Sequence, residues 1–259
     1  MINNIEKEVL NITKWIEQYV ENSGAKGVVI GNSGGKDSAV VIALATKALG
    51  SKRVLTVAMP CNSISQDYED AKLVANSFEV PLVTVDLSQT YKEVENEVNN
   101  MLKRENIANS IEREAGINTK PRLRMTTLYM IAQTLNYLVI GTGNLCEAMV
   151  GYTTKWGDNS SDFNPIGNFT VEEVLQIGRY LNVPKKIVEK APNDGLGGMT
   201  DEEKMGITYS QIAEYIETGK TDTEAMKIIE RKYKVSVHKR KIVPVYPYTR
   251  RNCLVEKMN

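Results

Sequence analysis

Gly31-Asn32-Ser33-Gly34-Gly35-Lys36-Asp37-Ser38 is the stretch that decides the fold of this chain. It lies between two apolar runs, residues 27–30 and 39–45, so the sequence predicts a strand, a glycine turn and a helix. Paired glycines let the backbone approach an anion because no Cβ intervenes. The N-terminus of the following helix offers free N–H groups and a positive dipole end. Asp37 in such a phosphate cradle favours a divalent cation, since Mg²⁺ binds one or two carboxylates together with phosphate oxygens.

Two familiar glycine motifs fit this octapeptide poorly. A Walker A loop needs Ser or Thr after Gly-Lys, whereas Asp37 follows Lys36, and no glycine stands five positions before Gly35. A nucleophile elbow of the G-x-S-x-G type fits residues 31–35, and the later His238 gives the right chain order. Such an elbow follows several strands and an upstream oxyanion loop, however, and only one helical segment precedes this strand. The motif therefore disfavours both a kinase-type loop and a hydrolase.

Two interpretations remain. A turn without function is common between strand and helix, but it rarely places two serines and an aspartate around paired glycines. Residues 33–38 resemble, at every fixed position, the S-G-G-x-D-S loop of the PP-loop ATP pyrophosphatase superfamily. Those enzymes cut ATP between the α and β phosphates and adenylate a substrate.

Composition predicts an ordinary globular protein. The 259 residues are 42% hydrophobic and 25% charged, and the formal net charge is zero, which argues against a nucleic-acid-binding protein. The charged N-terminus does not resemble a signal peptide, and the longest apolar run is too short to span a bilayer. Cys61, Cys146 and Cys253 are widely spaced and fit neither a disulfide framework nor a zinc site. We therefore expect a reduced, cytoplasmic protein of one domain.

Helices alternate with apolar strands along the first half of the chain. Helices are predicted at about 2–22, from the octapeptide to 49, and at 67–78, 90–115, 125–135, 171–181, 209–217 and 224–233. Strands are predicted at 27–31, 54–59, 81–85 and 137–141. This alternation predicts an α/β fold, a doubly wound, mostly parallel, Rossmann-like sheet with helices on both faces.

Ligands of such sheets bind beyond the carboxyl ends of the strands. The octapeptide, Met59-Pro60 and Gly141-Thr142-Gly143 all follow predicted strands, so they should line one crevice. Residues 144–168 and 193–199 are predicted to be long loops, which are usually functional or mobile. A basic run from Arg231 to Lys241 is either a solvated helix end or an anion site.

Further motifs narrow the resemblance to one family over almost the whole chain, the ammonia-dependent NAD synthetases. These motifs are Pro121-Arg122-Leu123-Arg124-Met125, Gly141-Thr142-Gly143-Asn144, Glu147-Ala148, Gly151-Tyr152-Thr153-Thr154-Lys155-Trp156-Gly157-Asp158 and His238-Lys239-Arg240. Glutamine-hydrolysing members carry an additional nitrilase-like domain, for which 259 residues leave no room. The resemblance thus implies a single NAD synthetase domain over residues 1–259 that uses free ammonia.

The resemblance implies a two-step ligase reaction. The nicotinate carboxylate of deamido-NAD first attacks ATP, giving an acyl-adenylate and pyrophosphate, and ammonia then displaces AMP. Asp37 and Glu147 match the family's Mg²⁺ ligands, and both follow strands. The ATP-binding residues would be Gly31, Asn32, Ser33, Gly34, Gly35, Lys36, Asp37, Ser38, Met59 and Thr142.

The resemblance also implies a dinucleotide site and a homodimer. The matching deamido-NAD-binding residues are Arg122, Tyr152, Lys155, Asp162, His238 and Lys239. Asp158 matches the carboxylate that would bind ammonium and help to remove its proton. Two positions depart from the family: Val171 stands where an ATP-binding lysine is common, and Asn193 where Ser or Thr is common. A tRNA-modifying PP-loop enzyme and a non-catalytic adenine-nucleotide sensor remain the alternatives.

Overall fold

The computed structural model describes residues 1–62, 65–190 and 200–246. Its sheet consists of β1 (Gly27–Gly31), β2 (Val54–Ala58), β3 (Leu82–Thr84) and β4 (Tyr137–Val139). These strands are parallel and lie in the order β3-β2-β1-β4. The predicted parallel α/β sheet is therefore confirmed. The chain adds strands outward from β1 on one side and then returns to its other side, so the carboxyl end of β1 is a topological switch point.

β1 is the buried centre of the sheet because its residues are apolar on both faces. Val28 and Ile30 belong to one hydrophobic core, whereas Val29 belongs to another with Val139 and Ala132. Side chains alternate between the faces of a strand, so this run of apolar residues requires cover on both sides.

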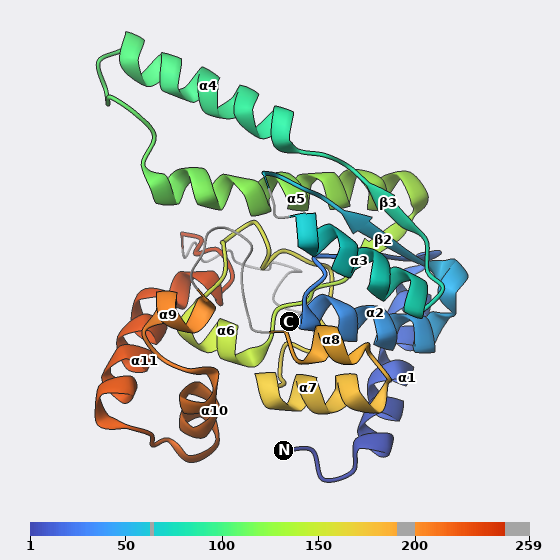
Figure 1. Ribbon diagram of the computed structural model, residues 1–259. Coiled ribbons are helices and arrows are strands. Elements are labelled where there is room, and N and C mark those ends of the chain that lie inside the picture. Colours follow the sequence, from blue (N-terminus) through green and yellow to red (C-terminus); the bar gives the residue numbers. More distant parts are fainter. Residues whose placement is uncertain (63–64, 191–199, 247–259) are drawn as a thin grey trace, which may run out of the picture.

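Helices supply that cover. α1 (Ile5–Ser23), α2 (Lys36–Leu49) and α7 (Val171–Tyr180) pack together on the face that Val28 and Ile30 contact. α5 (Arg113–Leu135) packs on the opposite face against β1 and β4. Figure 1 shows α4 (Ser88–Arg104) extending away from the sheet beside the first part of α5.

The prediction of one helix over 90–115 is wrong. α4 ends at Arg104, and α5 begins only at Arg113 and continues through Pro121. No helix was predicted over 116–124, although proline inside a helix removes only one backbone hydrogen bond. Pro121 is buried, and a Cβ at Gly157 would lie 3.1 Å from its Cβ. We infer that packing of Pro121 beside Gly157 compensates for the backbone hydrogen bond that α5 loses at the proline.

The last part of the described chain forms a smaller helical cluster with its own core. It comprises α6 (Leu145–Val150), α9 (Asp201–Met205), α10 (Tyr209–Thr218) and α11 (Thr223–Val235), followed by the 3₁₀ turn η2 (Val237–Lys239). α6 lies within 144–168, so the prediction of an unbroken loop there is wrong at this point. A six-residue helix is too short to show a periodic pattern. The predicted loop at 193–199 lies outside the described residues.

Three predicted segments meet at the carboxyl edge of the sheet. The octapeptide follows β1, Met59 and Pro60 follow β2, and residues 141–143 follow β4. Two further helices are α3 (Ser65–Ser77), which follows β2, and α8 (Lys185–Val188), which follows α7; the 3₁₀ turn η1 (Ser51–Arg53) precedes β2. Among the described residues, no helix is long and apolar enough to cross a membrane.

Candidate active site

The glycine turn leads directly into the N-terminus of α2. Gly35 is the N-cap residue, and no side chain of the described residues caps the helix. The Gly34 N–H donates to Asn32 Oδ1 at 3.2 Å, and the Gly35 N–H donates to Ser33 Oγ at 3.2 Å. The amides of Gly34 and Gly35 are thus engaged within the loop, and the first-turn N–H groups of α2 are donors available to an anion. Contact of the octapeptide with ATP phosphates stays a prediction.

Polar side chains of the octapeptide brace its backbone. Ser38 Oγ donates to the Gly35 carbonyl at 3.0 Å and lies 3.1 Å from Ser33 Oγ. Lys36 is buried, with Nζ 3.4 Å from Asp37 Oδ2 and 5.5 Å from the centre of the Tyr209 ring. The Lys36 side chain therefore lies beside Asp37, at the start of α2.

Asn144 connects the two predicted metal ligands. It is the N-cap of α6: its Oδ1 accepts from the Glu147 N–H at 3.0 Å, and Glu147 Oε2 accepts from the Asn144 N–H at 2.9 Å. Its Nδ2 donates to Asp37 Oδ1 at 3.4 Å. A capping box thereby places Glu147 next to a carboxylate that is more than a hundred residues away in sequence.

The electrostatics of this pair favour a cation. Burial, reinforced by the charge of Asp37, raises the pKa of Glu147 well above its ordinary value. In the described part of the chain, no group of three or more His, Cys, Asp or Glu residues could hold a metal by itself. Mg²⁺ commonly binds one or two carboxylates and completes its shell with phosphate oxygens and water. Asp37 and Glu147 fit a Mg²⁺ ion that binds together with a polyphosphate.

Asp158 lies on a loop that is fixed to α5. Thr154 Oγ1 donates to Asn118 Oδ1 at 2.6 Å, and Asp158 Oδ1 accepts from the Thr154 N–H at 2.7 Å. Asp158 has solvent-exposed surface, yet desolvation by the surrounding protein raises the pKa of its carboxyl group. Its charge also acts on Glu147, so the structure brings Asp158 near the acidic pair.

Lys239 and Arg240 hold the backbone near this loop. Lys239 Nζ donates to the carbonyls of Gly151 at 2.8 Å and Thr153 at 2.5 Å. Arg240 Nη1 donates to the Ala148 carbonyl at 3.0 Å, at the end of α6. Burial lowers the pKa of Lys239. The two residues therefore support the chain between Glu147 and Asp158, and substrate contact by Lys239 stays a prediction.

The other predicted dinucleotide-binding residues differ in their surroundings. Arg122 Nε donates to the Lys155 carbonyl at 3.2 Å, and His238 is exposed in η2. Asp162 instead accepts from the Val139 N–H at 2.7 Å and from Tyr129 Oη at 3.2 Å, so it fixes the end of β4. Tyr152 Oη donates to Asp201 Oδ1 at 3.2 Å. Their contacts with substrate stay predictions.

Three predicted positions for ATP have distinct surroundings. Met59 is buried, and its carbonyl accepts from Arg124 Nε at 3.1 Å, so this group is already engaged. Thr142 follows β4 at the carboxyl edge and is half-buried. Val171 is buried in the core of the C-terminal helical cluster, where an apolar residue packs well. Asn193 lies outside the described residues.

Sequence reasoning missed two contributors to this site. Asn144 belongs to one of the motifs, but its role as a link was not predicted, although Asn-x-x-Glu is a recognisable capping pattern. Arg124 also belongs to a motif, and nothing in the sequence indicated that it would contact the end of β2.

Known proteins resemble this chain over nearly its full length. The sequence model of the NAD synthase family matches residues 8–246. The NH(3)-dependent NAD(+) synthetase of Carboxydothermus hydrogenoformans is 42% identical over 93% of this chain and 98% of its own length. Among solved structures, the NMN synthetase of Francisella tularensis has a TM-score of 0.88 and 32% identity, covering 95% of this chain and 100% of that one. The NH3-dependent NAD synthetase of Campylobacter jejuni has a TM-score of 0.76 and 25% identity, covering 94% and 99%.

The matches span nearly the whole chain, in sequence as well as in fold. Sequence and structure lead to one conclusion: the chain belongs to the NAD synthase family.

Proposed function

We propose that this protein is an ammonia-dependent NAD synthetase, a carbon–nitrogen ligase that converts deamido-NAD to NAD. It consumes ATP and ammonia and releases AMP and pyrophosphate. The observation that carries this proposal is the junction of Asp37 and Glu147 through Asn144 at the N-terminus of α2. Three relatives that are 39–43% identical to this chain over 93–94% of its length share the name NH(3)-dependent NAD(+) synthetase.

The first step joins two anions, so charge neutralisation dominates its barrier. A nicotinate carboxylate oxygen attacks the α-phosphorus of ATP, and the bond to the β-phosphate bridging oxygen breaks, releasing pyrophosphate. The first turn of α2 and Lys36 would stabilise the phosphate charge. Asp37 and Glu147 would hold Mg²⁺, which when bound neutralises charge on the phosphates and on the leaving pyrophosphate.

The second step needs neutral ammonia at the acyl carbon. Ammonia adds to the carbonyl carbon, AMP leaves, and one proton must be removed to give the amide. Asp158 is placed near the acidic pair on a loop fixed by Thr154, and desolvation raises the pKa of its carboxyl group. A carboxylate of raised pKa both attracts ammonium and accepts a proton more readily.

Asp158→Asn is expected to slow amide formation about 100-fold while leaving adenylate formation within a few-fold of the wild type. Asparagine keeps the oxygen that accepts from the Thr154 N–H, so the loop should stay in place. Pyrophosphate release in a single turnover without ammonia measures the first step, and NAD formation after ammonia addition measures the second. An equal loss in both steps would refute this role.

One structural neighbour favours a second candidate within the same reaction. Its protein is named an NMN synthetase, and its TM-score and identity exceed those of the Campylobacter enzyme. By the same chemistry, the acceptor would then be nicotinic acid mononucleotide, which lacks the adenylate half of deamido-NAD. Residues that contact only that half would decide between the two acceptors.

Pyrophosphate release with each acceptor tests the proposal. Purified protein with ATP, Mg²⁺ and ammonium should release one pyrophosphate per amide formed, with a kcat/KM at least about tenfold higher for deamido-NAD than for the mononucleotide. A higher kcat/KM for the mononucleotide than for deamido-NAD would favour the second candidate. If neither acceptor causes pyrophosphate release, both candidate functions are excluded. A tRNA-modifying enzyme or a nucleotide sensor would then remain.

Assembly and location are further parts of this proposal. We expect a homodimer, because α4 extends from the sheet with its apolar residues Val94 and Val98 exposed. We expect a cytoplasmic protein, because Cys146 is a buried free thiol, as is usual in a reducing compartment. Light scattering of the purified protein tests the dimer.

A further inference from the structure

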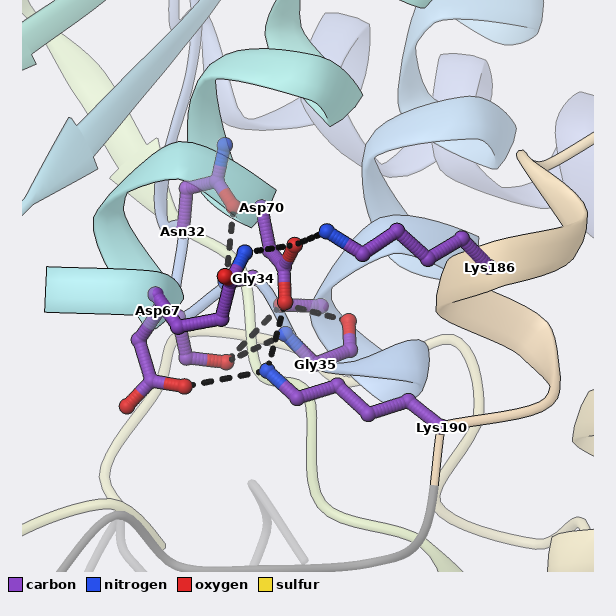
Figure 2. A network of polar contacts seen from close by, with 10 residues as sticks. Asn32, Gly34, Gly35, Asp67, Asp70, Lys186 and Lys190 are labelled. Carbon is purple, nitrogen blue, oxygen red and sulfur yellow. Dashed lines mark hydrogen bonds and ion pairs between the residues drawn. The ribbon is translucent and has the colours of Figure 1, made fainter. Parts of the chain in front are cut away.

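A buried carboxylate on α3 lies behind the glycine turn and outside the site described above. Asp70 is 1% exposed and accepts three hydrogen bonds: from Gln66 Nε2 at 2.9 Å, Lys186 Nζ at 2.6 Å and Lys190 Nζ at 2.8 Å. Lys190 Nζ also donates to Asp67 Oδ1 at 3.0 Å. Two lysines and two aspartates thus form a charge-balanced cluster, which is shown in Figure 2.

This cluster joins parts of the chain that are distant in sequence. Asp67 and Asp70 belong to the first turns of α3, whereas Lys186 lies in α8 and Lys190 follows it. Burial opposes ionisation of Asp70, but the hydrogen bonds from the two lysines outweigh it and hold the pKa of Asp70 below its ordinary value. The carboxylate is therefore charged at neutral pH, and a buried charge of this kind needs a cationic partner.

The start of α3 is in direct contact with the glycine turn. A Cβ at Gly34 would lie 2.5 Å from the Asp67 carbonyl oxygen and 2.9 Å from the Asp70 Cβ. Asn32 reinforces this contact, because its Nδ2 donates to the Ala71 carbonyl at 2.9 Å while its Oδ1 accepts from the Gly34 N–H. The start of α3 thus leaves no room for a side chain at Gly34, and Figure 2 shows Gly34 beside Asp67 and Asp70.

We propose that Asp70, through its ion pairs with Lys186 and Lys190, is a positioning residue that sets the glycine turn for nucleotide binding. The lysines hold α3, α3 holds Gly34 and Asn32, and these hold the turn that precedes the α2 N-terminus. Asp70 itself touches no substrate in this scheme. The inference deepens the proposed function, since it rests on the octapeptide being the ATP-phosphate site.

The cluster differs from an ordinary surface ion pair because its central carboxylate, Asp70, is buried. Exposed pairs contribute little, and α3 carries one such pair, Glu69 with Lys72 at 2.9 Å. α8 similarly carries the exposed pair of Lys185 with Glu189 at 3.7 Å. Each helix therefore provides a matched control beside a residue of the cluster.

Asp70→Asn tests the proposal, with Glu69→Gln as its control on the same helix. The probe is α,β-methylene-ATP with Mg²⁺, whose Kd is measured by calorimetry, together with the KM values for ATP and deamido-NAD. Asp70→Asn should weaken nucleotide binding about tenfold and raise the KM for ATP similarly, with the KM for deamido-NAD within about twofold, because misplacement of the turn affects the phosphates first. Glu69→Gln should leave all three constants unchanged.

Lys186→Gln is the second variant, because removing the buried charge of Asp70 also endangers folding. Lys186 is 60% exposed and one of two cationic partners, so this change should leave the fold intact and weaken nucleotide binding by a smaller factor. Lys185→Gln is its control and should bind like the wild type. Folded variants with unchanged nucleotide affinity, or with equal losses for both substrates, would overturn the proposal. If the wild type fails to use deamido-NAD, the proposed function fails, whereas the nucleotide Kd still decides the role of Asp70.

Discussion

Glu147→Gln is expected to lower the rate of pyrophosphate release about 1,000-fold, equivalent to about 4 kcal/mol of transition-state stabilisation. Glutamine retains an oxygen that can accept from the Asn144 N–H, so the capping box of α6 should persist. What the substitution removes is the negative charge beside Asp37. Stopped assays of pyrophosphate release at several Mg²⁺ concentrations measure the effect, and the loss should be partly relieved at high Mg²⁺.

Thermal unfolding separates this effect from a loss of structure. Without Mg²⁺, the variant should unfold at the same temperature as the wild type or higher, because two neighbouring carboxylates no longer repel each other. Glu173→Gln is the matched control: Glu173 closes the capping box of α7 by accepting from the Thr170 N–H at 2.9 Å. That control should retain full activity. Near-normal pyrophosphate release by Glu147→Gln would show that Glu147 serves only as a helix cap.

Gly34→Ala is expected to lower the free energy of unfolding by about 3 kcal/mol and to abolish detectable ATP binding. Two causes add. Gly34 has a φ of +71°, which disfavours a residue with a Cβ, and that Cβ would overlap the Asp67 carbonyl oxygen at 2.5 Å. The neighbour is backbone in the first turn of α3, so relief requires moving the helix or the turn. Urea denaturation and nucleotide calorimetry measure the two losses.

Gly24→Ala isolates the first cause. Gly24 has a φ of +70°, nearly that of Gly34, but a Cβ added at Gly24 would meet no heavy atom of its surroundings within 4 Å. This control should lose only about 1 kcal/mol of stability and no nucleotide affinity. Equal losses in the two variants would mean that backbone conformation alone accounts for the effect and that contact with α3 contributes nothing.

Much of the fold could be predicted because the pattern of each element is local. The buried stripe Val9, Ile12, Ile16 and Val20 indicated α1, and the apolar run of β1 indicated a strand covered on both faces. The predictions failed where tertiary contacts override local preference. No helix was predicted over 116–124, yet α5 continues through Pro121, which is buried beside Gly157. α6, α8 and α9 are too short to produce a periodic signal.

The candidate site was predictable in membership but not in arrangement. The octapeptide motif singled out Asp37, and the resemblance singled out Glu147 and Asp158. No sequence pattern showed that Lys239 would donate to the Gly151 and Thr153 carbonyls, or that Asp162 would hold the end of β4. Such contacts join residues far apart in the chain, and each depends on side chains finding hydrogen-bond partners only after the sheet has formed.

Local sequence was sufficient to specify the strand, turn and helix around the octapeptide, because glycine and apolar runs act within a few residues. It was also sufficient for the family, and it nominated the acidic residues of the candidate site. The folded chain was needed to show that Asn144 joins Asp37 to Glu147, and that Asp70 pairs with lysines more than a hundred residues away. The physical reason is that a buried charge or polar group must be matched by whatever groups the fold brings within hydrogen-bond distance, and chain order does not specify which these are.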